Sequence, residues 1–113
     1  MVKISFLNFY ILDAPEITSD SSIVYTGVGH KFYLGCHVTS KPRADIYMTR
    51  DNRHVSNKSS RAYQIQKDNN LYYFVNNVAG DDFGEYVCHA NNSIGSSRHS
   101  IIVVGKNQSH QII

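Results

Sequence analysis

Two cysteines, Cys36 and Cys88, carry the most distinctive chemistry in this sequence, and a histidine follows each of them directly. Thiolates and imidazoles bind zinc, but two cysteines alone do not complete a structural site, and no histidine lies at C-x2-C-type spacing from either. Successive side chains of a strand point to opposite faces, so cysteines buried between two sheets would leave His37 and His89 on opposite outer faces, separated by at least about 10 Å. The sequence therefore predicts no metal site.

A disulfide between Cys36 and Cys88 suits these two residues better. It would close a loop of about 50 residues, which stabilises a fold by about 4 kcal/mol in the chain-entropy view. Such bonds persist in oxidising compartments, so the pair predicts an extracellular location, as a secreted protein or the ectodomain of a cell-surface protein. The alternative is a cytosolic sandwich that buries two reduced cysteines.

Three sequons for N-linked glycosylation bear on the same question. Asn57, Asn91 and Asn107 each begin an N-x-[ST] motif. A chain with 10 Asn and many Ser would contain about one or two such motifs by chance. Three sequons therefore add modest support for secretion and predict N-glycans at these positions.

Composition and missing motifs exclude several function classes. The sequence has no G-x-S-x-G, no H-E-x-x-H and no spaced pair of acids near an expected cleft, which predicts a non-enzymatic protein without a cofactor. Its net charge of +2 is too small to make nucleic acid a default partner. No apolar run approaches the roughly 18 residues that span a bilayer, so this segment is not expected to insert into a membrane.

The elements that must position the cysteines are short strands. From Lys31 to Thr39 the residues alternate, with Phe32, Leu34, Cys36 and Val38 on one face. Further strands are expected at residues 15–22, 23–26, 45–50, 63–66, 71–78, 84–90 and 101–104. About seven or eight strands, separated by turn signals every 8–12 residues or so, indicate an antiparallel sandwich.

The 113 residues favour a single domain, because single cores usually comprise about 100–150 residues. We expect this domain at residues 15–105. Residues 1–14 are expected to be an N-terminal arm or the remnant of a leader, and residues 106–113, which show no pattern, a linker tail.

The segment from Asp82 to Cys88 carries the strongest local signal, D-x-G-x-Y-x-C, and it resembles immunoglobulin domains over about residues 15–105. The resemblance implies an all-β, two-sheet antiparallel Greek-key sandwich with one disulfide between the sheets. It also implies that the Tyr86 hydroxyl bonds to upstream backbone, that Gly84 permits a tight turn and that Asp82 pairs with Arg61.

The separation of the cysteines resembles the intermediate type, or I-set, of adhesion molecules, receptors and muscle proteins. One position departs from that family, since Met48 stands where a core tryptophan is usual. A shifted register would turn Tyr47 inward instead, but Ile46 and Met48 alternate better. A methionine covers less area than tryptophan, so we expect a looser core.

The resemblance implies recognition of other proteins, homophilic or heterophilic, as in adhesion or receptor binding. It equally allows an intracellular structural module of a muscle or cytoskeletal scaffold protein. Both statements depend on analogy of fold rather than on a site.

The strand pattern itself offers one surface hypothesis. If the inward residues of two neighbouring strands are correctly assigned, Tyr33, Tyr72 and Phe74 meet on one outer face, with a dip beside them at Gly35. An exposed aromatic patch of this kind marks an interface with a partner, a second copy or the chain's own arm. The alternative is scattered rings covered by the stems of Lys and Gln side chains.

The opposite outer face would be a second candidate. We expect it to show five residues, Tyr47, Thr49, Glu85, Val87 and His89. A glycan on Asn91 would restrict access to one end of it.

Overall fold

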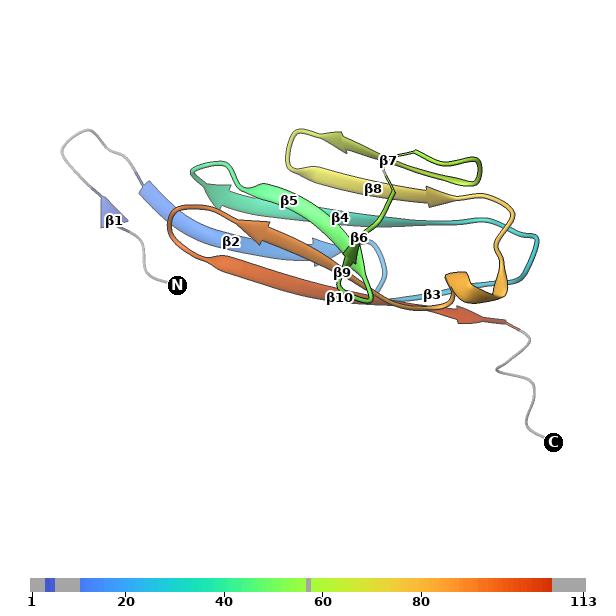
Figure 1. The fold of residues 1–113 in the computed structure, drawn as a ribbon. Helices are drawn as coiled ribbons and strands as arrows, with labels where there is room; N and C mark the ends of the chain where they lie inside the picture. Colours follow the sequence, from blue (N-terminus) through green and yellow to red (C-terminus); the bar gives the residue numbers. More distant parts are fainter. Residues whose placement is uncertain (1–3, 6–10, 57, 107–113) are drawn as a thin grey trace.

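Residues 4–5, 11–56 and 58–106 are described by the computed structural model, and they form a sandwich of two β-sheets (Figure 1). The first sheet has the strand order β1-β2-β4-β8-β7 and the second has the order β3-β10-β9-β5-β6. The strands are β1 (Ile4–Ser5), β2 (Ile11–Ser19), β3 (Ile23–Thr26), β4 (Phe32–Lys41), β5 (Asp45–Arg50), β6 (Arg53–His54), β7 (Ala62–Lys67), β8 (Asn70–Val75), β9 (Gly84–Asn91) and β10 (Ser96–Gly105). The predicted all-β sandwich is confirmed.

The chain changes sheets early. β2 pairs with β4 in the first sheet, and β3 then runs parallel to β10 in the second. This parallel pair departs from the antiparallel arrangement that the sequence predicted throughout. β2 begins at Ile11, inside the segment expected to be an arm. The described residues contain no helix long and apolar enough to cross a membrane.

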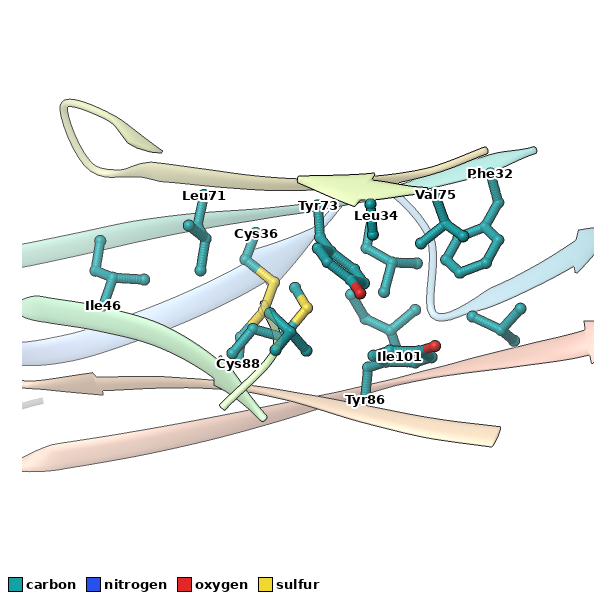
Figure 2. Packing of buried hydrophobic residues seen from close by; sticks show 14 of the residues in the cluster. Phe32, Leu34, Cys36, Ile46, Leu71, Tyr73, Val75, Tyr86, Cys88 and Ile101 are labelled. Carbon is teal, nitrogen blue, oxygen red and sulfur yellow. A yellow bond between two sulfur atoms is a disulfide. The ribbon is translucent and has the colours of Figure 1, made fainter. Parts of the chain in front are cut away.

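Cys36 of β4 and Cys88 of β9 form the predicted disulfide between the two sheets (Figure 2). Both residues are fully buried, and their Cα atoms lie 6.7 Å apart. Side chains of the two layers meet around the bond, and the core cluster includes Phe32, Leu34, Val38, Ile46, Leu71, Tyr73, Val75, Val78, Tyr86, Ala90, Ile101 and Val103. Strands that alternate apolar and polar residues can bury one face in this way.

Met48 lies inside this core. Its side chain is 1% exposed, and the residue lies opposite Cys88 in the register of β5 and β9. The alternative register with Tyr47 inward does not occur, because Tyr47 is only partly buried and stacks on surface histidines. The thioether therefore occupies the position at which the resembled family carries tryptophan.

A hydrogen-bonded corner fixes the entry to β9. The Tyr86 hydroxyl donates to the backbone oxygen of Asp82 over 2.7 Å, and Arg61 Nη1 donates to Asp82 Oδ2 over 2.7 Å. Gly84 has φ of 135°, a conformation that favours glycine. Burial alone would raise the pKa of Asp82, but hydrogen bonds from Arg61 and from the Ala79 backbone hold that pKa below its usual value.

Arg50 of β5 belongs to the same corner, although no sequence motif pointed to it. Its Nη1 donates to the Tyr86 hydroxyl over 3.1 Å, its Nη2 donates to the Phe83 backbone oxygen, and its guanidinium carbon lies 4.9 Å from the Tyr86 ring centroid. A Cβ at Gly84 would lie 3.0 Å from Arg50 Nη2. The glycine therefore leaves room for this close approach, and it also suits the backbone conformation.

Candidate protein interface

Aromatic side chains gather on the outer face of the first sheet. Tyr33 on β4 lies opposite Phe74 on β8, and Phe74 lies opposite Tyr63 on β7. The ring centroids are 5.9 Å apart for the first pair and 5.0 Å for the second, and both pairs are stacked. Tyr72 lies 6.4 Å from Phe74 and pairs with Ile65. We call Tyr33, Tyr63, Tyr72, Phe74 and Ile65 the ring face.

The alternation of β8 explains why these rings point outward. Leu71, Tyr73 and Val75 are buried in the core, whereas Tyr72 and Phe74 are only partly buried. Successive residues of a strand point to opposite faces, so a register that buries the first three must expose the other two. Pairing with β4 then brings Tyr33 beside them, as the sequence predicted.

Tyr63 and Ile65 extend the ring face beyond the three residues that the sequence singled out. Tyr33, Tyr63 and Ile65 are 47%, 38% and 47% exposed. The sequence predicted a strand at residues 63–66, but it did not show which strand lies beside it. The pairing of β7 with β8 supplies that information, and a contiguous apolar surface across three strands results.

The expected dip does not lie directly over Gly35, although Gly35 and Tyr33 line a hollow on the side of Ile23 and Tyr25. Gly35 is buried, because the Asp20 carboxylate and the Tyr72 ring cover it. A Cβ at this position would collide with Asp20 Oδ2 and lie 3.2 Å from Tyr72 Cδ1. The glycine therefore lets the Asp20 carboxylate lie close over β4.

A polar network borders the ring face at this point. His37 Nε2 lies 2.7 Å from Asp20 Oδ1, and His37 Nδ1 lies 2.8 Å from Asn70 Oδ1. Tyr33 donates its hydroxyl hydrogen to Asp20 Oδ2 over 3.2 Å. Both ring nitrogens of His37 face oxygen acceptors, so the protonated imidazolium satisfies both. The hydrogen bonds to Asn70 and Asp20 accordingly raise the pKa of His37.

The outer face of the second sheet carries a different cluster. The Tyr47 ring stacks between two imidazoles, with centroids 4.7 Å from His54 and 4.5 Å from His89. Burial, followed by the charges of Arg98 and His54, lowers the pKa of His89. His89 Nε2 also lies 2.8 Å from the Thr49 hydroxyl oxygen.

Two residues expected to be exposed on that second face are buried instead. Thr49 is 8% exposed and Val87 is 9% exposed. They lie opposite each other on β5 and β9, the inner strands of the sheet, where neighbouring side chains cover them. The face is therefore smaller and more imidazole-rich than the sequence predicted.

Of the three sequons, only one lies among the described residues. Asn91 ends β9 and is partly exposed, and its neighbour Asn92 donates from Nδ2 to the backbone oxygens of Asp13 and Pro42. Asn57 and Asn107 lie outside the described residues. A glycan on Asn91 stays a prediction.

Metal ligands do not cluster in the described part of the chain. No group of three His, Cys, Asp or Glu side chains there could hold a metal ion. His37 and His89 lie on strands of different sheets and have different partners.

Comparison with known proteins identifies the fold family. The family model described as an immunoglobulin domain matches residues 14–92. Among curated proteins, the mouse IgLON family member 5 is 28% identical over 89 residues, which are 77% of this chain and 26% of that protein. Chicken smooth muscle myosin light chain kinase is 31% identical over 85 residues, which are 74% of this chain and 4% of the kinase. The chain thus spans about a quarter or less of the length of these relatives.

Solved structures agree in fold. A three-domain fragment of titin superimposes with a TM-score of 0.74 at 22% identity, covering 84% of this chain and 33% of the fragment. The complex of Dpr2 with DIP-Theta contains a chain that superimposes with a TM-score of 0.73 at 19% identity, covering 83% of this chain and 33% of that one. At these identities the likeness establishes the fold alone. Together with the family match and the inter-sheet disulfide, it shows that the chain belongs to the immunoglobulin domain family.

Proposed function

We propose that this chain is a non-enzymatic, extracellular recognition module of a larger secreted or cell-surface protein, and that it binds other proteins through the ring face. The observation that carries the proposal is the stacked cluster of Tyr33, Tyr63 and Phe74 on an outer sheet face. Solvated sheet faces are normally polar, and contiguous exposed aromatic surface marks protein interfaces. Tyrosines are also frequent at the centres of such interfaces.

The disulfide supports the extracellular part of the proposal. Cys36 and Cys88 are joined and fully buried, and such bonds form in oxidising compartments. The partly exposed sequon at Asn91 is compatible with a secreted glycoprotein. Asn91 belongs to the second sheet, so a glycan there would leave the ring face open.

A second candidate is an intracellular structural module of a muscle or cytoskeletal scaffold. The 31% identity to chicken smooth muscle myosin light chain kinase favours it. The two candidates share the fold and differ in redox state and glycosylation, so chemical measurements distinguish them.

The location is tested by intact mass spectrometry of material purified from a secretory host and from the native source. Reduction should add about 2 Da as two hydrogens, and glycosidase should remove mass from Asn91. Free thiols together with an unmodified Asn91 in native material would support the intracellular candidate instead.

The ring face is tested by displaying the domain on multivalent beads against a collection of purified ectodomains and against itself. The variant Tyr72→Ser/Phe74→Ser should lose the binding that the wild type shows. The matched control, Tyr47→Ser on the second sheet, should keep it. Circular dichroism verifies that both variants fold, and retained binding by the folded ring variant refutes the proposal.

A further inference from the structure

We infer that the ring face accepts an acidic protein surface, in which carboxylates surround an apolar centre, rather than a second copy of this chain. This inference rests on the proposed function of the ring face and adds the chemistry of its partner. It follows from the charges around the rings and from the way the rings are oriented.

Three exposed lysines surround the ring face. Lys31 directly precedes Phe32, the first residue of β4. Lys58 forms a bridge pair with Tyr63, and Lys67 ends β7. All three are exposed, and no salt bridge joins any of them to a carboxylate among the described residues. Their charges are therefore available to a partner.

Two carboxylates near the ring face are already engaged. Asp20 contacts His37 and Tyr33, and Asp82 is held by Arg61 at 2.7 Å. Glu16 lies opposite Thr39, at the far end of the sheet from Lys31. Asp68 directly follows Lys67, is exposed and forms no salt bridge among the described residues, so it offsets part of the lysine charge. The three lysines outnumber it, so the rim of the ring face keeps a net positive charge.

The orientation of the rings favours the same partner. Phe74 is stacked on Tyr33 at 26° and on Tyr63 at 19°, so the faces of these rings are turned toward one another. Ring edges carry the positive part of the aromatic quadrupole. The edges of stacked rings therefore favour oxygen acceptors such as carboxylates, and the Tyr33 hydroxyl already donates to one, the Asp20 carboxylate.

A second copy of this chain is the weaker candidate, because its own Lys31, Lys58 and Lys67 would face the same three lysines of the first copy. Like charges brought together at an interface disfavour association. A sulfated polysaccharide would be attracted by charge alone and would gain little from the apolar centre. An apolar centre within a charged rim is instead the anatomy of a protein–protein interface.

Two synthetic peptides serve as probes, each of equal length with the same two aromatic residues, one carrying four Glu and the other four Lys. Binding is followed by amide chemical shifts of the folded domain in 50 mM salt. The Glu peptide should shift the amide signals of Tyr33, Tyr72 and Phe74. It should also bind at least tenfold more tightly than the Lys peptide. Raising the salt to 500 mM should weaken binding of the Glu peptide several-fold, because salt screens the attraction between exposed charges.

Charge reversal supplies the control. Lys31→Glu/Lys58→Glu/Lys67→Glu should weaken binding of the Glu peptide at least tenfold, since it removes three attractive charges and adds three repulsive ones. The matched variant reverses three exposed arginines elsewhere, Arg43, Arg53 and Arg98, and should bind within about twofold of the wild type.

The outcomes separate this inference from the proposed function. Equal binding of the two peptides, no binding of the Glu peptide, stronger competition by a heparin fragment, or concentration-dependent self-association through the ring face overturns the acidic partner. If Tyr72→Ser/Phe74→Ser abolishes partner binding while the lysine reversal does not, the ring face stands and its charge selectivity fails. If the ring variant binds normally, the proposed function fails.

Discussion

Replacing Tyr86 with Phe removes a single hydroxyl from the corner before β9, and the structure defines what that hydroxyl does. The Tyr86 side chain is 2% exposed, and burial raises its pKa to about 12. The hydroxyl donates to the Asp82 backbone oxygen over 2.7 Å and accepts from Arg50 over 3.1 Å. The variant therefore removes one hydrogen-bond partner from the Asp82 backbone oxygen and one from the Arg50 guanidinium.

The expected loss follows from these two bonds. A neutral hydrogen bond contributes about 1 kcal/mol, and one to a charged group about 1.5–3 kcal/mol. Arg50 keeps its hydrogen bond to the Phe83 backbone oxygen and is partly exposed. The contribution of its bond to Tyr86 therefore lies at the low end of the range for charged groups. We expect Tyr86→Phe to lower the free energy of unfolding by about 2.5 kcal/mol.

Tyr73→Phe is the matched control. Tyr73 is 8% exposed and its ring lies 5.9 Å from that of Tyr86, but no hydrogen bond of its hydroxyl is seen among the described residues. Its loss should stay below about 0.5 kcal/mol. Urea denaturation measures both variants, and Tyr86→Phe should lower the midpoint by about 1–2 M. Equal effects of the two substitutions would refute the corner as a hydrogen-bonded unit.

Three further predictions concern the disulfide and the polar network. The double variant Cys36→Ala/Cys88→Ala should lose about 4 kcal/mol or more of unfolding free energy, because the bond closes a loop of 52 residues, and chemical denaturation measures the loss; a loss below about 1 kcal/mol would contradict it. The pKa of His37 is raised in the folded state, so the stabilising effect of its hydrogen bonds is present below the pKa of the unfolded state. This effect is lost as the pH rises through the pKa of His37 in the folded state. Asp20→Asn should therefore lower the free energy of unfolding at pH 6 and hardly change it at pH 9. Both side chains are about one-third exposed, which limits this effect to about 1 kcal/mol or less, and a difference constant across pH would contradict the interaction. Gly35→Ala should displace the Asp20 carboxylate and lower the pKa of His37 in an NMR titration, as Asp20→Asn does; an unchanged pKa would show that the carboxylate does not depend on this glycine.

The parts of the fold that sequence reasoning anticipated are those encoded locally. Alternation in residues 31–39 and 45–50 depends on neighbours two positions apart, and it placed Cys36 and Met48 inside. The corner is similarly local, since Asp82 and Tyr86 are four residues apart. The disulfide follows once both cysteines point into one sandwich.

Features that depend on distant partners were missed. Arg50 and Tyr86 are 36 residues apart, and Asp20 and His37 are 17 apart, so no local motif joins them. β10 begins at Ser96 rather than at residue 101, because the polar segment from Ser96 to Ser100 has no apolar signal and is held by pairing with β9. Side-chain cover from neighbouring strands likewise buries Thr49, which alternation alone placed outside.

The candidate interface was predictable only in part from the sequence. Tyr33, Tyr72 and Phe74 follow from alternation and from the expected neighbours of two strands. Tyr63 and Ile65 required the register of β7 against β8, which sequence spacing does not supply. The chemistry of the rim, where Asp20 is engaged and the lysines are not, emerges only from side-chain contacts.

The most direct test of the account is the affinity of the folded Tyr72→Ser/Phe74→Ser variant for the protein ligand that the wild-type domain binds, measured beside Tyr47→Ser. We expect at least a tenfold loss of affinity for the first variant and less than a twofold change for the second, since truncation of central aromatic contacts costs about 2 kcal/mol or more. Undiminished affinity of the first variant, or a loss confined to the second, would contradict it.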